Sequence, residues 1–355
     1  MIAPPPPPVP AVSNRPHRAA LIEDALNAAV ARRLVRRGWV PQVVGHPGYG
    51  TPGWVRVLGR ALLAPPGTRE GEAAEQDSGA EARAVRGWRS FVTVKCPGAL
   101  VRVTVADVTT TVRAERGGYV DAVVACDLAP GTHEATLEVA GHVTTVRLQV
   151  IDPAAPHGLI TDVDDTVWVT ALPRPVVAAW NSFVLHQDAR RPVPGMAELI
   201  DRWLARHPGA PVFYLSTGAW NVAPTLERFL RRHGFPRGTF LLTDWGPTNT
   251  GWFRSGQAHK RASLRTLAEQ FPHTRWLLVG DDGQHDPQIY AEAAERYPDS
   301  VAAVAIRRLS PAEQVLSHGT TTPLPRPVDV PPGPVRVEGA DGHELALRLM
   351  SAGVL

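Results

Sequence analysis

Three aspartates, Asp162, Asp164 and Asp165, lie within four consecutive positions near the middle of the chain. They follow an apolar run that begins at Leu159 and is typical of a buried strand. Carboxylates this close repel one another unless something positive is bound among them. Oxygen ligands suit Mg²⁺, so the cluster predicts a magnesium site.

Other polar groups follow later apolar runs or open helical segments. These groups are Ser216 and Thr217 after PVFYL, Lys260 in HKRASLRTL, and Asp281, Asp282 and Asp286 after WLLVG. Each has a structural alternative. The hydroxyls and Asp286 are suitable helix N-caps, and Lys260 is replaceable by Arg261 as the local cation.

The segments that carry these groups alternate between apolar runs of four to six residues and helical patterns, from His157 onward. This alternation predicts an α/β fold with a parallel sheet that is covered by helices on both faces. Ligands of such sheets bind beyond the carboxyl ends of the strands. The candidate groups are all expected at that edge.

The order of the four groups, D-x-D-x-T, Ser/Thr, Lys and G-D-x(4)-D, resembles the haloacid dehalogenase (HAD) superfamily, which implies a Rossmann-like sheet. In this interpretation Asp162 attacks phosphorus and forms an aspartyl-phosphate. Asp164 acts as general acid and then base, and in the superfamily its backbone carbonyl also binds the metal. Ser216 and Lys260 complete the catalytic set by stabilising the phosphoryl oxygens.

Further residues join this expected site. The metal ligands are Asp162, Asp164 and Asp281, with Asp282 or Asp286 in support; the phosphate-binding residues are Thr166, Thr217 and Gly218. The implied cofactor is Mg²⁺.

Longer segments, among them PVFYLSTGAWN and WLLVGDDGQHDPQIYAE, resemble the conserved domain of the actin-patch-associated phosphatidate phosphatase family, over roughly residues 156–309. The resemblance implies Mg²⁺-dependent conversion of phosphatidate to diacylglycerol. The run STGAW and Asp282 depart from the usual family pattern. Because both lie near the expected substrate position, they affect the prediction of specificity more than that of chemistry.

The first half of the chain has a different sequence pattern. Its strand patterns alternate, as in Val101, Val103 and Val105, and predict a small antiparallel β-sandwich. A helical pattern ending in Arg32, Arg33, Arg36 and Arg37 precedes it. That helix either packs on the β region or lies as a basic amphipathic helix on a membrane. Cys96 and Cys126 are expected to be reduced thiols, with a disulfide as the alternative.

These textures predict four regions: a disordered Pro-rich tail at 1–14, a helix with the β-sandwich at 15–152, a HAD-like catalytic domain at 153–310, and a Pro-rich linker with a final strand and helix at 311–355. A segment between the first two motifs is a candidate small insertion over the site, with Trp180, Phe183, Val184 and Leu185 as possible apolar contacts or core residues. A Gly-rich segment at 244–256 adds Trp245, Trp252 and Arg254 as candidate pocket residues.

Charge and hydropathy restrict the partners. The net charge of +3 is too small to imply nucleic acid, and no apolar run is long enough to span a membrane. We therefore expect a cytoplasmic phosphatase, peripheral to a membrane if its substrate is a lipid. The alternatives are a phosphatase for soluble esters or polynucleotide ends, and a non-catalytic scaffold with the HAD fold.

Overall fold

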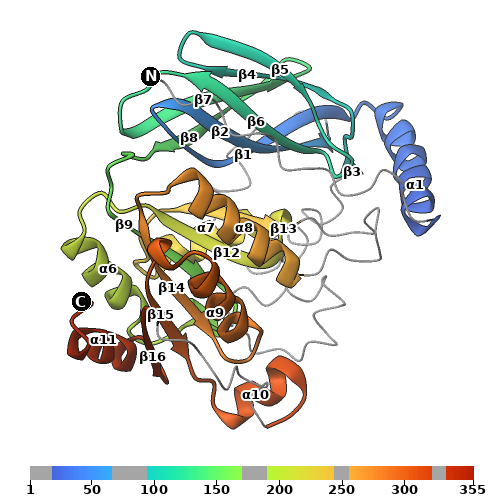
Figure 1. Ribbon diagram of the computed structural model, residues 1–355. Helices are drawn as coiled ribbons and strands as arrows, with labels where there is room; N and C mark the ends of the chain where they lie inside the picture. Colours follow the sequence, from blue (N-terminus) through green and yellow to red (C-terminus); the bar gives the residue numbers. More distant parts are fainter. Residues whose placement is uncertain (1–17, 66–93, 170–189, 244–255, 322–332) are drawn as a thin grey trace. The chain divides into compact units, whose positions relative to one another are not determined.

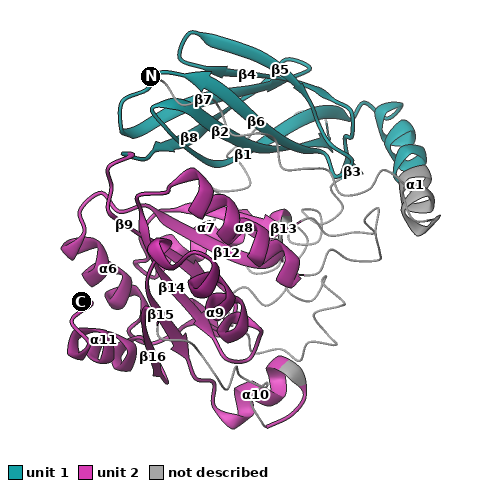
Figure 2. Ribbon diagram, viewed as in Figure 1, with its two compact units in different colours: residues 1–152, 244–254 teal, residues 153–243, 255–355 magenta. Residues whose placement is uncertain are grey.

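The computed structural model describes residues 18–65, 94–169, 190–243, 256–321 and 333–355, which divide between two compact units (Figures 1 and 2). Unit 1 comprises residues 1–152 and 244–254, and unit 2 comprises residues 153–243 and 255–355. The predicted Pro-rich tail, the aromatic residues of the candidate insertion and those of the segment 244–254 lie outside the described residues. None of the described helices combines the length and apolar character needed to cross a membrane.

Unit 1 consists of one helix and eight described strands. They are α1 (Arg18–Val35), β1 (Val40–Thr51), β2 (Gly53–Ala64), β3 (Val94–Lys95), β4 (Leu100–Val105), β5 (Val108–Arg113), β6 (Tyr119–Cys126), β7 (Gly131–Val139) and β8 (His142–Val150). A tight two-residue turn at Ala140 and Gly141 joins β7 to β8, and both residues have the positive φ that such a turn requires.

The strands of unit 1 form one sheet in the order β3-β2-β1-β8-β7-β4-β5, with β6 also paired to β2. The sheet curls so that β5 contacts β6. Alternate side chains fill its interior, and Val101, Val103 and Val105 are fully buried there, as their spacing predicts.

This arrangement differs from the predicted antiparallel sandwich in two respects. The strands form a single curled mixed sheet, and β1 pairs with β8 in parallel over Gly48–Gly50. The register of β1 against β2 shifts between His46 and Tyr49. Such an irregularity bends a strand and re-aims its edge, a feature that alternation alone does not reveal. Cys96 and Cys126 are both free thiols.

Unit 2 alternates strands and helices. Its strands are β9 (His157–Asp162), β10 (Trp168–Val169), β11 (Arg191–Pro192), β12 (Val212–Ala219), β13 (Thr239–Thr243), β14 (Arg275–Asp281), β15 (Val301–Arg307) and β16 (Val335–Gly339). Its α-helices are α6 (Met196–Arg206), α7 (Ala223–Arg232), α8 (Gly256–Gln270), α9 (Asp286–Arg296), α10 (Pro311–His318) and α11 (Gly342–Ser351).

Six strands form a parallel sheet in the order β13-β12-β9-β14-β15-β16. Strand β9 is first in sequence but central in space, with β12 and β14 on its two sides. The chain therefore winds outward in both directions from β9. In open sheets of this order, ligands bind where the winding reverses, beyond the carboxyl ends of the central strands.

Helices cover both faces of this sheet. On one face, α6, α7 and α11 share a core with Leu159, Tyr214 and Leu277, and α6 packs beside α11 (Figure 1). On the other, α8 and α9 contact each other, α8 contacts β12, and α9 contacts β14 and β15. Because both faces are covered, the strands read as continuous apolar runs rather than as alternating ones.

Candidate active site

Asp162 is the last residue of β9 and is only 1% exposed. Lys260, on the first turns of α8, places its Nζ 2.6 Å from Oδ1 of Asp162 and 2.5 Å from Oδ1 of Asp286. All three side chains are buried, so water and salt screen these ion pairs much less than they screen surface pairs. The structure thus joins the first, third and fourth predicted motifs.

Asp281, at the end of β14, completes a cluster with Asp162 and Asp286, in which one ligand oxygen from each lies within 4.8 Å of the others. Among the described residues, the Oδ2 atoms of these three aspartates are buried without a hydrogen-bond donor. Gly280 permits this crowding, since a Cβ there would lie 2.6 Å from Oδ2 of Asp286.

The electrostatics of this cluster favour an added cation. Burial raises the pKa of Asp162 well above its usual value; Lys260 opposes the shift, and Asp286 and Asp164 add to it. Burial likewise raises the pKa of Asp281, reinforced by Asp286 and Asp162. One lysine leaves three carboxylates with excess negative charge. A cluster of oxygen donors with more carboxylates than cations fits a hard divalent ion such as Mg²⁺.

Asp164 lies beside this cluster and is held by two donors. Trp168 Nε1 donates to its Oδ1 at 3.0 Å, and the Ser216 hydroxyl donates to its Oδ2 at 3.0 Å. The Gly218 amide donates to Ser216 Oγ at 2.9 Å. The structure therefore links the predicted acid–base residue to the predicted second motif and fixes the orientation of its carboxyl group.

The two predicted phosphate-binding threonines differ. Thr166 is fully buried, and its hydroxyl has no hydrogen-bond partner among the described residues. Thr217 is half-buried, and its carbonyl accepts a hydrogen bond from the Thr243 hydroxyl at 2.8 Å. A Cβ at Gly256 would lie 2.6 Å from the Thr217 side chain, so the start of α8 passes close to the end of β12.

Arg307, at the end of β15, anchors the loop that follows Asp162. Its Nη1 donates to the Asp165 carbonyl at 2.7 Å, its Nη2 to Glu313 at 2.6 Å, and its Nε to the Ala340 carbonyl at 3.1 Å. Asp165 has φ 58°, a left-handed conformation that side chains other than glycine disfavour. The arginine thus ties a strained loop residue to two later segments.

Asp282 does not belong to the three-aspartate cluster. Its Oδ1 accepts hydrogen bonds from the Leu309 amide at 2.8 Å and from Gln314 Nε2 at 2.7 Å. Of the two aspartates considered as metal support, the structure places Asp286 in the cluster, while Asp282 connects the end of β14 to α10.

Sequence reasoning missed Trp168, Arg190 and Arg307. Trp168 binds Asp164 through its indole nitrogen, and the Arg190 guanidinium lies 4.0 Å above the Trp168 ring. Burial lowers the pKa of Arg190 to about 10. Trp168 follows Asp164 by four positions, which is the one sequence signal that points to it. Arg307 is 142 residues from its partner Asp165, and no local pattern indicates that contact.

Part of the chain matches a known protein family. Residues 157–308 match the family model described as phosphatidate phosphatase APP1, catalytic domain. The matched segment begins at β9 and ends just after Arg307, so it includes each of the predicted site residues. It covers less than half of the chain.

Two fungal proteins align with about the same length of this chain. Phosphatidate phosphatase APP1 of Saccharomyces cerevisiae is 25% identical over 154 residues, which is 42% of this chain and 25% of the yeast protein. An uncharacterised Schizosaccharomyces pombe protein is 27% identical over 150 residues, which is 42% of this chain and 24% of that protein. The chain therefore aligns with about a quarter of the length of these relatives.

The solved structures that align with this chain resemble it only weakly. A Xanthomonas citri carbohydrate acetylesterase aligns with 85% of this chain and 72% of its own at 12% identity, with a TM-score of 0.28. A Bacteroides uniformis β-glucuronidase 2 mutant aligns with 76% of this chain and 36% of its own at 8% identity, with a TM-score of 0.21. Neither score supports a shared fold.

Proposed function

We propose that this protein is a Mg²⁺-dependent phosphatase of the HAD type that hydrolyses a phosphate monoester through an aspartyl-phosphate. The observation that carries the proposal is the buried cluster of Asp162, Asp281 and Asp286 around Lys260, with one unpartnered carboxylate oxygen on each aspartate. The match of residues 157–308 to a phosphatase catalytic domain supports it, as does the yeast relative.

The proposed metal site consists of Asp162, Asp281, the Asp164 carbonyl and a supporting Asp286. When bound, Mg²⁺ supplies the positive charge that lets a carboxylate approach a phosphate dianion. Lys260 remains as a second cation beside the nucleophile. It holds the Asp162 carboxylate in one orientation, and burial makes its charge more effective.

In the first step, an Asp162 oxygen forms a bond to phosphorus while the bond to the leaving alkoxide breaks. Asp164 gives its proton to that alkoxide, and then removes a proton from the water that attacks the aspartyl-phosphate. Phosphate leaves and Asp162 is regenerated. Trp168 and Ser216 support these roles, because together they orient both oxygens of the Asp164 carboxyl group.

Phosphoryl oxygens are expected to bind at the hydroxyls of Thr166, Thr217 and Ser216 and at the Gly218 amide. The Thr166 hydroxyl is available because it has no partner among the described residues. Ser216 would turn its donor from Asp164 to the substrate once Asp164 carries a proton, since a protonated carboxyl group is a weaker acceptor.

Phosphatidate is the leading candidate substrate, on the strength of the yeast relative's name. The second candidate class is a soluble phosphate ester. A scaffold role is disfavoured by the buried carboxylates themselves. Several carboxylates with one lysine are costly to bury, and a protein without catalysis has no need to retain them.

A panel assay tests this function. The full chain is mixed with nitrophenyl phosphate, soluble sugar and nucleotide phosphates, a 3′- or 5′-phosphorylated oligonucleotide, and phosphatidate in mixed micelles. Phosphate release is measured with Mg²⁺, with Ca²⁺ and with EDTA. We expect release with Mg²⁺ only, since the looser coordination of Ca²⁺ misplaces the nucleophile. Full activity in EDTA, or no release from any ester, would overturn the proposal.

The metal site has a test that does not depend on turnover. Thermal unfolding is followed with Mg²⁺ and with EDTA for the wild type and Asp281→Asn. We expect Mg²⁺ to raise the wild-type Tm, because binding to the native state alone stabilises it. Asp281→Asn should raise Tm in EDTA by relieving repulsion, and should abolish the Mg²⁺ shift. An unchanged Mg²⁺ shift in the variant would remove Asp281 from the site.

A further inference from the structure

The short ribbon of β10 and β11 places Arg190 over an aromatic ring. The two strands pair antiparallel with Trp168 opposite Pro192, and the Val193 amide donates to the Val167 carbonyl at 3.0 Å. Arg190 precedes Pro192 by two positions, so it is the diagonal neighbour of Trp168 on the same face of the ribbon. Long side chains reach aromatic rings at that separation, and Cζ of Arg190 lies 4.0 Å from the centre of the Trp168 ring.

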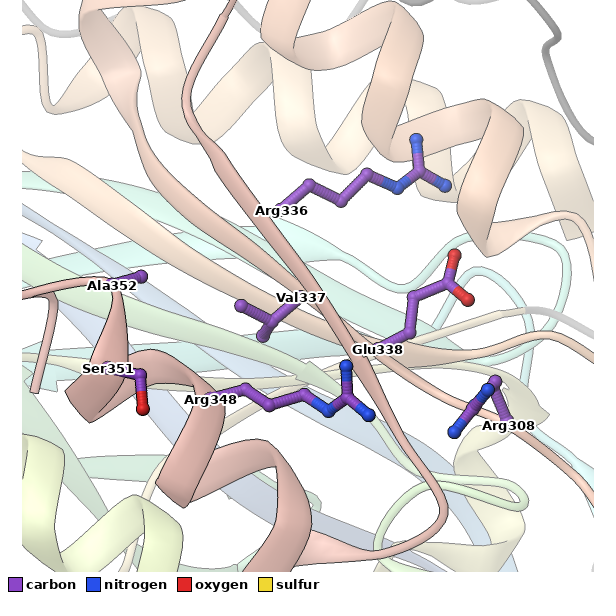
Figure 3. Close-up of a pocket in the computed structure, with 7 residues that line it drawn as sticks. All are labelled: Arg308, Arg336, Val337, Glu338, Arg348, Ser351 and Ala352. Carbon is purple, nitrogen blue, oxygen red and sulfur yellow. The ribbon is translucent and has the colours of Figure 1, made fainter.

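Arg348 shows the more usual surroundings of an arginine. It lines a hollow of about 560 Å³ beside β16 and α11, with Arg308 and Glu338 among its neighbours (Figure 3). Its side chain is exposed, and the Glu344 carboxylate accepts from its Nε at 3.0 Å. Exposed ion pairs of this kind contribute little. Arg190 is instead half-buried, and a cation–π contact strengthens as water is excluded, so Arg190 restricts the ring beneath it.

The ring beneath Arg190 connects it to the predicted acid–base residue. Trp168 is only 1% exposed, and Phe229 of α7 meets it edge-to-face with the ring centres 5.1 Å apart. Trp168 Nε1 donates to Asp164 Oδ1 at 3.0 Å. Because an indole is rigid, the position of its faces fixes the direction of its N–H bond. Arg190 therefore influences the direction from which Asp164 receives its hydrogen bond.

Asp164 depends most on this hydrogen bond during turnover. Its two oxygens accept one bond each, from Trp168 and from the Ser216 hydroxyl. Under the proposed function Ser216 turns its donor to the substrate, which leaves Trp168 as the donor that still holds Asp164 among the described residues. With Oδ1 occupied by the indole, the proton for the leaving alkoxide is carried on Oδ2. A displaced indole would move that proton away from the leaving oxygen.

We propose that Arg190 is a positioning residue for the general acid, because it holds the Trp168 ring so that Nε1 fixes the Asp164 carboxyl group. Arg190 needs no contact with the substrate in this role. The inference rests on the proposed phosphatase function and deepens it, since it adds a residue outside the four motifs to the acid–base step.

The leaving-group dependence of turnover tests this role. The value of kcat/KM is measured for the full chain with Mg²⁺, on nitrophenyl phosphate and on the best alkyl ester of the panel. Arg190→Met should lower kcat/KM about 10-fold for the alkyl ester, because a misplaced acid costs rate. The loss should be less than about threefold for nitrophenyl phosphate, whose leaving group needs no proton. Equal losses on the two esters would overturn the proposal.

Two further variants serve as controls for this measurement. Arg190→Lys keeps a cation over the ring, so it should recover most of the loss on the alkyl ester. Arg348→Met removes an exposed guanidinium from the hollow in Figure 3 and should leave both esters unaffected. Circular dichroism shows that each variant is folded.

A double variant tests whether the effect passes through the indole. Trp168→Phe keeps a ring beneath Arg190 but removes the Nε1 donor, so kcat/KM for the alkyl ester should fall about 10–100-fold. Adding Arg190→Met should cost less than about twofold more, because residues that act as a unit are not additive. A further loss of about 10-fold would overturn the proposal and place Arg190 against the substrate.

Hydrogen exchange of the indole tests the contact without turnover. The Trp168 Nε1–H signal is assigned by NMR as the one missing from Trp168→Phe, and its exchange with D₂O is followed without substrate. Exchange should be at least about 10-fold faster in Arg190→Met and unchanged in Arg348→Met, because a loosened ring opens its hydrogen bond more often. Equal exchange in the wild type and Arg190→Met would overturn the proposal. Failure of the phosphatase function appears separately, as a lack of phosphate release in the ester panel.

Discussion

The two units bury different kinds of side chain. Among the described residues of unit 1, the buried polar side chains are His46, Thr51, Arg60 and Thr144, and none is a carboxylate. Unit 2 buries five aspartates, which are Asp162, Asp165, Asp281, Asp282 and Asp286. In unit 1 the Asp121 carboxylate stays partly exposed and pairs with Arg56 across neighbouring strands.

The difference shows where each unit can bury carboxylate groups. Curling closes the unit 1 sheet around aliphatic side chains, where a buried carboxylate without a partner would weaken the fold. In unit 2 the carboxyl ends of parallel strands bring polar loop residues together at one edge, and the aspartates gather there. A carboxylate should therefore matter for activity in unit 2 and for little more than local stability in unit 1.

The largest expected effect comes from changing one carboxylate in each unit. Asp162→Asn should lower turnover of nitrophenyl phosphate by at least about 10⁴-fold, because the attacking oxygen is lost. Asp121→Asn removes a partly exposed ion pair, so turnover should be unchanged, with a stability loss of at most about 1 kcal/mol. Turnover and thermal unfolding are measured for both. Appreciable activity in Asp162→Asn would transfer the nucleophile to Asp165 or to water.

Asp164→Asn distinguishes acid–base work from nucleophilic attack within unit 2. Loss of a general acid and base costs about 10²–10⁴-fold. The loss in the first step should be smaller for nitrophenyl phosphate than for an alkyl phosphate, since nitrophenolate leaves without a proton. Slow hydrolysis should let a phosphoenzyme accumulate, which is detectable after acid quench with labelled substrate. Equal losses on good and poor leaving groups would contradict this assignment.

Arg307 and Arg308 are adjacent and carry the same charge, so comparing them tests the effect of position. Arg307 is buried and bonded to Asp165, Glu313 and Ala340, whereas Arg308 is exposed. We expect Arg307→Met to lower kcat about 10–100-fold with little change in KM, because a loop misplaced by about 1 Å costs rate. Arg308→Met should leave kcat unchanged.

Arg307→Lys restores the charge without the planar fork, so kcat should recover only in part. Circular dichroism establishes that the variants are folded. A folded Arg307→Met protein with wild-type kcat would show that the Asp165 contact is dispensable.

The smallest effect concerns the buried polar residues of unit 1. Burial lowers the pKa of His46 to about 3, with help from Arg60. Between that value and the ordinary value of 6.5, the unfolded chain binds one proton more than the fold, so stability is complete above 6.5 and falls with pH below it. The slope is at most about 1.4 kcal/mol per pH unit.

Denaturant unfolding of unit 1 between about pH 4 and pH 7 should therefore be less steep with pH in His46→Asn than in the wild type. His133→Asn is the control, since its ring is only half-buried and bonds to the Ala129 carbonyl near the surface. Equal pH slopes for the wild type and His46→Asn would contradict the buried neutral imidazole.

Much of the architecture is readable from local pattern. Alternation in β4, β7 and β8 indicates one buried face, and continuous apolar runs in β9 and β14 indicate a sheet covered on both sides. The motif spacing also placed Asp162, Lys260, Asp281 and Asp286 at one edge, because carboxyl ends of parallel strands meet there.

The remaining features depend on contacts between distant segments. Asp281 and Asp282 are adjacent in sequence, yet the first joins the cluster and the second bonds to Leu309 and Gln314. Only the packed position of α10 decides between them. The parallel pairing of β1 with β8 likewise depends on a register shift in β1 that has no clear composition signal.

The placement of β16 and α11 has a consequence for biosynthesis. Both follow the segment matched to the catalytic domain, yet β16 completes the parallel sheet and α11 packs against it. Proteins emerge from the ribosome from their N-terminus, so unit 1 has all its described strands available while unit 2 still lacks its last strand. Until then the ladder edge of β15 is open to foreign strands, and Arg307 has no Ala340 to bind. Nascent unit 2 therefore carries an unpaired strand edge until β16 has been synthesised.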